Sequence, residues 1–196
     1  MRCGGEAGIS TRWSEYARLA GDDYRTPGWV VRVVVPQLHH RDCRWIWACA
    51  DHDDSELVRV FHEAGLGVTA SAEDFLAKTA LPDPKIDCIG TNPPFKLARQ
   101  FIEHALTLAP VVAMLARQDY DCAKTREHLF ACCESFAAKI TLIDRIVWVR
   151  RTDGIKEAPS DNHWWLIWDR RHQGPPTLSY ARRDEIRRAQ FDDAAA

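Results

Sequence analysis

Short apolar runs alternate along the chain with longer amphipathic stretches. The clearest runs are residues 44–50 (RWIWACA), 86–92 (IDCIGTN) and 111–117 (VVAMLAR). Strands of a parallel sheet have this composition, because helices cover both faces of such a sheet. Strands that alternate with helices of about 10 to 15 residues are typical of an α/β fold. The sequence therefore predicts an α/β protein with a Rossmann-like, doubly wound and mainly parallel sheet.

The segments between these runs have helical periodicity. Apolar residues recur at helical spacing in residues 57–64 and 96–109, and we expect a further helical stretch from about residue 119 to 133. A first helix is expected over residues 10–20, and residues 67–71 (GVTAS) are expected to form a strand. Local sequence preferences do not decide whether residues 27–38 form a helix or a strand.

The end of the chain departs from this alternation. Residues 139–149 and 163–169 both have strand character, and only the polar loop 150–162 separates them. That loop has no room for a crossover helix, so we expect an antiparallel hairpin at the sheet edge. Residues 181–196 are expected to form a weak helix that frays.

Composition limits the possible classes of protein. The 196 residues carry a formal charge of −2, which argues against a protein that coats nucleic acid by bulk electrostatics. Ten Lys and Arg against six Asp and Glu in residues 145–188 would suit phosphate contacts, or would simply form a solvated face. No signal segment and no apolar run of about 20 residues is present, so we expect a cytoplasmic protein without membrane contact.

Cysteine and histidine spacing indicates no metal site and no disulfide framework. The seven cysteines are an odd number without a C-x-x-C pair, and we expect them to be buried thiols. His39 and His40 are neighbours in sequence and would not share one face of a helix or strand.

The stretch Asn92-Pro93-Pro94-Phe95 ends one predicted strand and precedes a helix. Ligand sites of open α/β sheets form at the carboxyl ends of strands. The Asn92 side-chain oxygen and the Pro93 carbonyl are two acceptors, and the prolines restrict the direction of that carbonyl. Two fixed acceptors suit an NH2 donor, although a plain turn is the alternative interpretation.

An exocyclic amine on a base is a poor nucleophile, because its lone pair is delocalised into the ring. If both N–H bonds donate to Asn92 and Pro93, the lone pair is freed for attack, while Phe95 stacks on the ring. The motif therefore indicates methyl transfer to an aromatic amine.

Three segments carry a resemblance to a known family: TNPPF, DDYRTPGWVV with its Y-x-T-P pattern, and the closing APSDNHWWLIWD. In these the chain resembles the S-adenosylmethionine-dependent DNA adenine-N6 methyltransferases, particularly small ones of phage and prophage type. The resemblance implies a class I methyltransferase fold over residues 22–180, between an N-terminal helical extension (1–21) and a frayed tail (181–196).

The resemblance also implies roles for individual residues. It places Asn92, Pro93, Pro94 and Phe95 at the amine and base. It also makes residues 27–38 a helix. The residues that it sets against the methionine end of S-adenosylmethionine are Tyr24, Thr26 and Pro27.

The cofactor loop departs from the family pattern. The family has a G-x-G type loop after the first strand, whereas this chain has ACADHDDSELV, with Ala48 and Ala50 and no glycine before Ala64. Glycines let the backbone approach a ligand, and side chains at His52 and Asp54 would crowd that space. We expect weakened cofactor binding or loss of activity. The acidic residues are equally well explained as a solvated loop that caps the next helix.

The second cofactor segment follows residues 67–71. By resemblance, Glu73 would bind the ribose hydroxyls and Asp74 the adenine amine of the cofactor, with Phe75 as a packing neighbour. A helix N-cap at Asp74 is the alternative interpretation.

A DNA substrate requires the adenine to leave the base stack. Arg150, Arg151 and Lys156, in the polar loop 150–162, are expected to contact phosphates. The same chemistry would also serve methylation of RNA or of protein glutamine. A third hypothesis is an impaired family member that keeps the fold and nucleic-acid binding. The sequence indicates neither a recognition sequence nor an oligomeric state.

Overall fold

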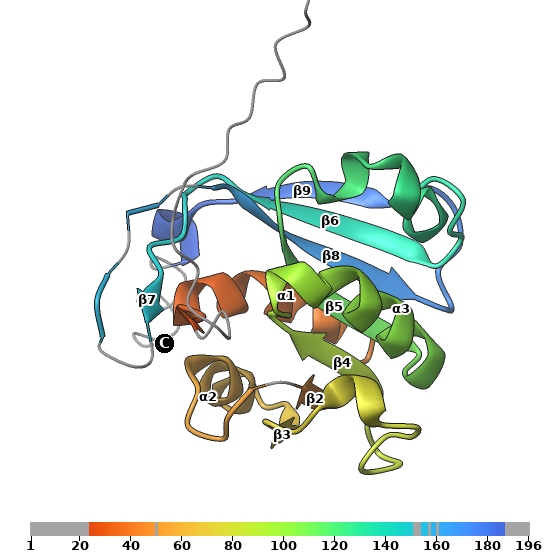
Figure 1. Cartoon of the computed structure of the whole chain (residues 1–196), viewed down its shortest axis with the longest axis horizontal. Helices are drawn as coiled ribbons and strands as arrows, with labels where there is room; N and C mark the ends of the chain where they lie inside the picture. The colour runs from red at the N-terminus through yellow and green to blue at the C-terminus, as the bar shows by residue number, and fades with distance from the viewer. Residues whose placement is uncertain (1–23, 50, 151–153, 157, 160, 187–196) are drawn as a thin grey trace, which may run out of the picture.

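A mixed sheet of seven strands forms the centre of the molecule (Figure 1). The computed structural model describes residues 24–49, 51–150, 154–156, 158–159 and 161–186. The strand order is β3-β2-β4-β5-β8-β6-β9. The strands are β2 (Trp45–Cys49), β3 (Gly67–Ser71), β4 (Cys88–Thr91), β5 (Val111–Arg117), β6 (Phe136–Leu142), β8 (His163–Asp169) and β9 (Thr177–Ala181).

The first four of these strands are parallel, which confirms the predicted Rossmann-like sheet. β8 is antiparallel to both β5 and β6, as the short connection required. The predicted position of this hairpin at the sheet edge is wrong, because β8 inserts between β5 and β6 and β9 forms the edge. The reason lies in side-chain burial. Trp165 and Leu166 point to opposite faces and are both fully buried, whereas Leu178 of β9 is 59% exposed.

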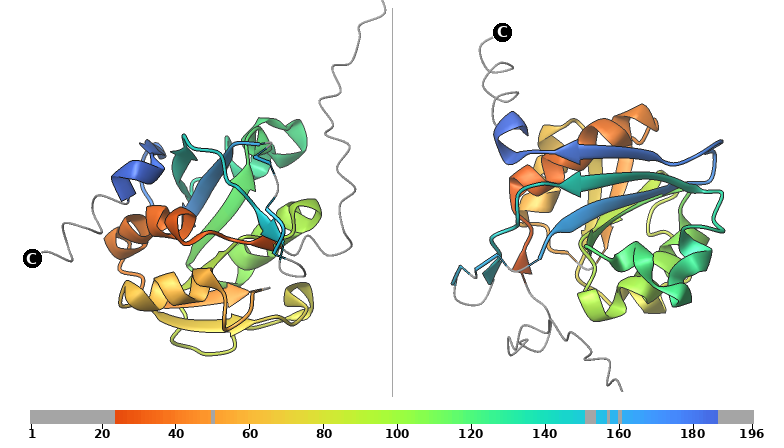
Figure 2. Two further views of the ribbon diagram at one scale, coloured as in Figure 1. Left: turned by 90° about the vertical axis from the view of Figure 1, so that its left-hand side faces the viewer. Right: turned by 90° about the horizontal axis from the view of Figure 1, so that it is seen from above.

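Helices cover both faces of the sheet (Figure 2). α1 (Gly28–His40) and α2 (Glu56–Glu63) pack on one face, and α3 (Ala98–Leu108) packs on the other. The predicted helix over residues 27–38 is confirmed. Its apolar side chains Val30, Val34 and Leu38 recur at a spacing of four and are fully buried, so tertiary packing outweighs the strand preference of valine.

The expected helical stretch at residues 119–133 contains two 3-10 segments, η3 (Tyr120–Cys122) and η4 (Lys124–Leu129), and no α-helix. Asp119 precedes them in the left-handed region at φ 67° and makes no side-chain cap. Two further 3-10 turns, η1 (Phe75–Ala77) and η2 (Phe95–Leu97), follow β3 and β4.

The predicted strand at residues 139–149 is split. β6 ends at Leu142, and β7 (Val149–Arg150) instead pairs antiparallel with β1 (Tyr24–Arg25). Figure 1 shows β7 beyond the ends of the main strands, on the side where β4 ends. β9 was not predicted, because residues 177–181 lack the apolar pattern of a buried strand. A helical turn over residues 183–186 follows it, and the predicted helix at residues 10–20 lies outside the described residues.

The prediction that the cysteines are buried is only half right. Cys43, Cys49 and Cys88 are buried in the core, and burial raises the pKa of the Cys49 thiol well above its usual value. Cys122 and Cys132 are exposed, because they lie in the 3-10 region and the turn after it.

Candidate functional site

The candidate site begins where β4 ends. Asn92 follows Thr91, the last residue of this strand. The Thr91 hydroxyl donates a buried hydrogen bond of 2.6 Å to the carbonyl of Cys49, the last residue of β2. This bond ties together the carboxyl ends of two neighbouring parallel strands, which is where ligands bind in open α/β sheets.

The Asn92 amide is held in one orientation. Its Nδ2 donates to the Oγ1 of Thr26 at 3.2 Å, and Thr26 is buried immediately before α1. The Asn92 Oδ1 is also buried, and it has no hydrogen-bond partner among the described residues. An unmet buried acceptor costs roughly 1 to 3 kcal/mol, so a native structure keeps one where it has a use for it.

The adjoining prolines present a second acceptor. The Pro94 carbonyl accepts from the Leu97 N–H at 2.8 Å. Within the described residues, no hydrogen bond reaches the carbonyl of Pro93, a buried residue. The Asn92 Oδ1 and the Pro93 carbonyl therefore both lack a hydrogen-bond donor among the described residues.

Phe95 lies in an aromatic cluster. Its ring centroid is 6.1 Å from that of Trp148 and 5.7 Å from that of His163. The Arg117 guanidinium lies 5.9 Å from the Phe95 centroid and pairs with the Asp161 carboxylate at 2.8 Å. The half-buried Phe95 thus has two aromatic neighbours and one cation around it.

Sequence analysis missed His163 as a residue of this site. It is the first residue of β8, directly opposite Arg117 of β5, and it is 1% exposed. Burial is the main cause that lowers the pKa of its imidazole to about 4; Arg117 also lowers it, and the carboxylate and backbone of Asp161 act in the opposite direction. The imidazole is therefore neutral at pH 7. The only available signal was a histidine at the start of an otherwise apolar strand.

We call the segment between β4 and η2, residues 92–94, the Asn92 corner. The Y-x-T-P segment lies beside this corner. Thr26 bonds to Asn92, Pro27 is the N-cap residue of α1, and the Tyr24 ring lies 6.0 Å from that of Trp148. The fold therefore brings this segment and the N-P-P-F motif together, although 66 positions separate Thr26 and Asn92.

The other proposed cofactor residues are spread along the ends of β2 and β3. Ala48 is buried in β2, and Ala50 lies outside the described residues. Glu73 is exposed and pairs with Lys78, whereas Asp74 caps η1 by accepting from the Leu76 N–H at 3.1 Å. Phe75 is buried and packs against Trp47, Phe101 and His104.

The loop after β2 carries three aspartates, Asp51, Asp53 and Asp54. Asp51 is buried at the end of β2, while His52, Asp53 and Asp54 are exposed. The α2 cap is Ser55, whose Oγ accepts from the Val58 N–H at 3.2 Å. Asp51 instead accepts the His52 N–H at 2.8 Å, and none of these aspartates is the N-cap of α2.

Two of the three residues expected to contact phosphates lie in the β7 region. Arg150 pairs with Tyr24 in the β1–β7 ladder, and Lys156 is exposed and forms a bridge with Val149. Arg151 lies outside the described residues. Trp165 and Trp168 of β8 are fully buried and pack in the core.

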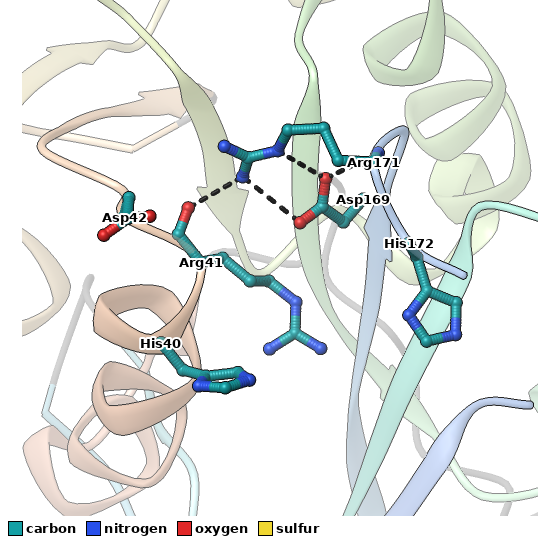
Figure 3. Close-up of a pocket in the computed structure, with 6 residues that line it drawn as sticks. All are labelled: His40, Arg41, Asp42, Asp169, Arg171 and His172. Atoms are coloured by element: carbon teal, nitrogen blue, oxygen red, sulfur yellow. Dashed lines mark hydrogen bonds and ion pairs between the residues drawn. The ribbon is translucent and has the colours of Figure 1, made fainter. Parts of the chain in front are cut away.

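A concavity of about 300 Å³ lies at the other end of the strands from Asn92, between the end of α1 and the end of β8 (Figure 3). Arg171 bonds there to both carboxylate oxygens of Asp169 and to the Arg41 carbonyl. Arg41 itself donates to the carbonyl and side-chain oxygens of Gln37, in the last turn of α1. Both guanidinium groups bond to acceptors of the protein, and Arg171 joins β8 to the residue after α1, so we interpret the cluster as a clamp between α1 and the sheet.

Comparison with known proteins supports the fold. No family model and no curated protein sequence matches the chain. Among solved structures, it is similar to PH1948 of Pyrococcus horikoshii, a protein proposed to be an RNA methyltransferase. The TM-score is 0.50 at 14% identity, over 74% of this chain and 85% of that one. The chain has the class I methyltransferase fold.

Two further matches have lower scores. The 23S rRNA methyltransferase ErmE matches with a TM-score of 0.46 at 10% identity, over 86% of this chain and 76% of that one. A dimethyladenosine transferase from Plasmodium falciparum matches with a TM-score of 0.39 at 11% identity, over 87% of this chain and 66% of that one.

Two further findings concern the described residues only. They contain no group of three or more His, Cys, Asp and Glu side chains arranged to hold a metal ion. None of their helices has both the length and the apolar character that a membrane span requires.

Proposed function

We propose that this protein transfers a methyl group from S-adenosylmethionine to the exocyclic N6 amine of adenine in DNA. The observation that carries the proposal is the Asn92 Oδ1, a buried acceptor without a partner at the carboxyl end of β4. Thr26 occupies the other end of the same amide, so the oxygen is the end left for a ligand.

The roles of the corner residues follow from their hydrogen-bonding capacity. Asn92 Oδ1 and the Pro93 carbonyl each accept one N–H of the amine, which frees the nitrogen lone pair. Pro94 restricts the backbone of Pro93, the residue before it, and so fixes the direction of the Pro93 carbonyl. Phe95 supplies an aromatic surface for the base.

S-adenosylmethionine would supply the methyl group as an electrophilic sulfonium. Tyr24, Thr26 and Pro27 would lie against its methionine end, Ala48 and Ala50 beneath it, and Glu73, Asp74 and Phe75 at its ribose and adenine. The buried carboxylate of Asp51 suits its positive charges. The two exposed carboxylates of Glu73 and Asp74 are engaged with Lys78 and the Leu76 N–H, so a bound ribose would have to share or displace these partners.

DNA is the substrate that the sequence favours, through the Y-x-T-P segment and the basic C-terminal third. Arg150, Arg151 and Lys156 would contact phosphates next to a flipped adenine. An amine of RNA or of a protein glutamine could bind to the same two acceptors at Asn92 and Pro93. The similarity to PH1948 concerns the fold alone and does not distinguish these substrates.

A second candidate function is an impaired methyltransferase fold that binds nucleic acid without catalysis. The observation that favours it is the loop from Asp51 to Ser55, which has no glycine where a backbone would approach a cofactor. Calorimetry separates the two candidates. A heat of binding for S-adenosylmethionine supports the enzyme, and no heat at millimolar cofactor leaves only the binding protein.

Radiolabelled methyl transfer to unmethylated duplex DNA, to RNA and to a whole-cell protein extract identifies the substrate. Label in N6-methyladenine of DNA is the expected result, and label only in RNA or protein would overturn the DNA assignment. Asn92→Ala should abolish transfer and spare cofactor binding. Gln100→Ala, which removes an exposed amide on α3, is the matched control and should stay active. Unchanged turnover in Asn92→Ala would refute the assigned role.

A further inference from the structure

His163 is a buried polar residue to which the proposed chemistry gives no role. Neither its Nδ1 nor its Nε2 has a hydrogen-bond partner of normal geometry among the described residues, and the side chain is 1% exposed. Its ring centroid is 5.7 Å from that of Phe95 and 5.2 Å from that of Trp148. The ring therefore contacts the same phenylalanine that is proposed to carry the base.

Aromatic packing alone does not explain a histidine here. A phenylalanine would fill the same cluster without two polar atoms that must lose their water. The charged groups beside the imidazole, Arg117 and Asp161, are paired with each other at 2.8 Å. Apart from a weak interaction with the Asp161 backbone, neither nitrogen has a hydrogen bond of normal geometry among the described residues, and burial makes this costly.

The neutral imidazole has one N–H donor and one acceptor nitrogen. Three positions before Phe95 in the chain, Asn92 has an unmet buried acceptor, its Oδ1. A base with an exocyclic amine has the complementary pair of groups, because the amine donates and a ring nitrogen accepts. One flat aromatic ligand could therefore satisfy both buried groups.

We propose that His163 is a specificity-determining residue of this site, whose N–H donates to a ring nitrogen of the amine-bearing base beside Phe95. This inference rests on the proposed function. Entry of the base must uncover the imidazole. Arg117 lies over the Phe95 ring with 30% of its side chain exposed, and it is the neighbour that would move.

The test compares substrates that differ by one ring nitrogen. Duplexes would carry adenine, 1-deazaadenine, 3-deazaadenine or 7-deazaadenine at the methylated position, and kcat/KM would be measured for each. With the wild-type protein, one deaza substrate should lose about tenfold or more in kcat/KM, as expected for one buried hydrogen bond. In His163→Phe, the ratio between that substrate and adenine should fall to about one, because the donor is absent.

His163→Gln keeps an N–H donor and should preserve part of the discrimination. If His163→Phe fails to fold, His163→Gln still tests the proposal. Thermal unfolding would show whether each variant is folded. Equal discrimination in the wild type and in His163→Phe, or none in the wild type, would overturn the role of His163 alone. Absence of transfer to adenine by the wild-type protein would instead overturn the proposed function.

Discussion

The hydroxyl oxygen of Thr26 accepts the amide N–H of Asn92 at 3.2 Å and thereby fixes which end of that amide remains unpaired. A freely rotating amide would present its NH2 group to an incoming amine for part of the time, and two donors repel each other. Thr26 therefore belongs to the Asn92 corner as a positioning residue, besides its expected place near the cofactor.

Thr26→Val tests this relationship, because valine has nearly the shape of threonine and lacks the hydroxyl. We expect kcat for methyl transfer to fall about tenfold, while KM for DNA stays within about twofold, since the DNA contacts are unchanged. Thr26→Ser keeps the acceptor and should retain most of the wild-type kcat. Equal kcat in the valine and serine variants would refute the positioning role.

Asn92→Ala should separate stability from activity. The substitution removes the bond to Thr26, which contributes about 1 kcal/mol, but it also removes a buried acceptor with no partner, so the two effects on the free energy of unfolding nearly cancel. We expect urea unfolding to give a free energy within about 1 kcal/mol of the wild type. A loss of about 3 kcal/mol or more would show that Asn92 is a structural residue.

His163 should make stability depend on pH in acid. Its pKa is about 4 in the folded protein, against about 6.5 unfolded, so between these values only the unfolded state binds the proton. The free energy of unfolding should therefore fall as the pH falls from about 6.5 to 4, by about 3 kcal/mol in total from this residue. Above pH 6.5 it should have no effect.

Urea unfolding at pH 4.5 and 7.5 measures this dependence. His163→Phe should lose less stability between the two values than the wild type does. His40→Gln, which changes an exposed histidine, should behave like the wild type. Identical pH dependence in all three proteins would contradict a buried neutral imidazole.

Ser55→Ala should weaken the start of α2, which follows the loop proposed to lie near the cofactor. The Ser55 Oγ accepts from the Val58 N–H and is the N-cap of this helix. We expect a loss of about 1 kcal/mol in the free energy of unfolding, and Ser55→Asp, which keeps an acceptor, should recover most of it. Thermal unfolding measures both. Calorimetry with S-adenosylmethionine would show whether the weakened loop also lowers cofactor affinity.

The sequence by itself determined the alternation of strands and helices and the rigid corner at Asn92. Both are local properties, because periodicity, proline geometry and strand ends depend on residues within one or two turns of each other. It could not determine that β8 lies between β5 and β6, since a short connection fixes only the direction of a strand and not its neighbours.

Only the tertiary structure decided which side chains complete the corner. Thr26 reaches Asn92 because α1 packs on the sheet with its first turn beside the end of β4, and His163 reaches Phe95 because β8 pairs with β5 in the register that sets His163 opposite Arg117. These contacts join segments far apart in the chain. No local pattern encodes them, because packing of the whole core selects the register and the helix position.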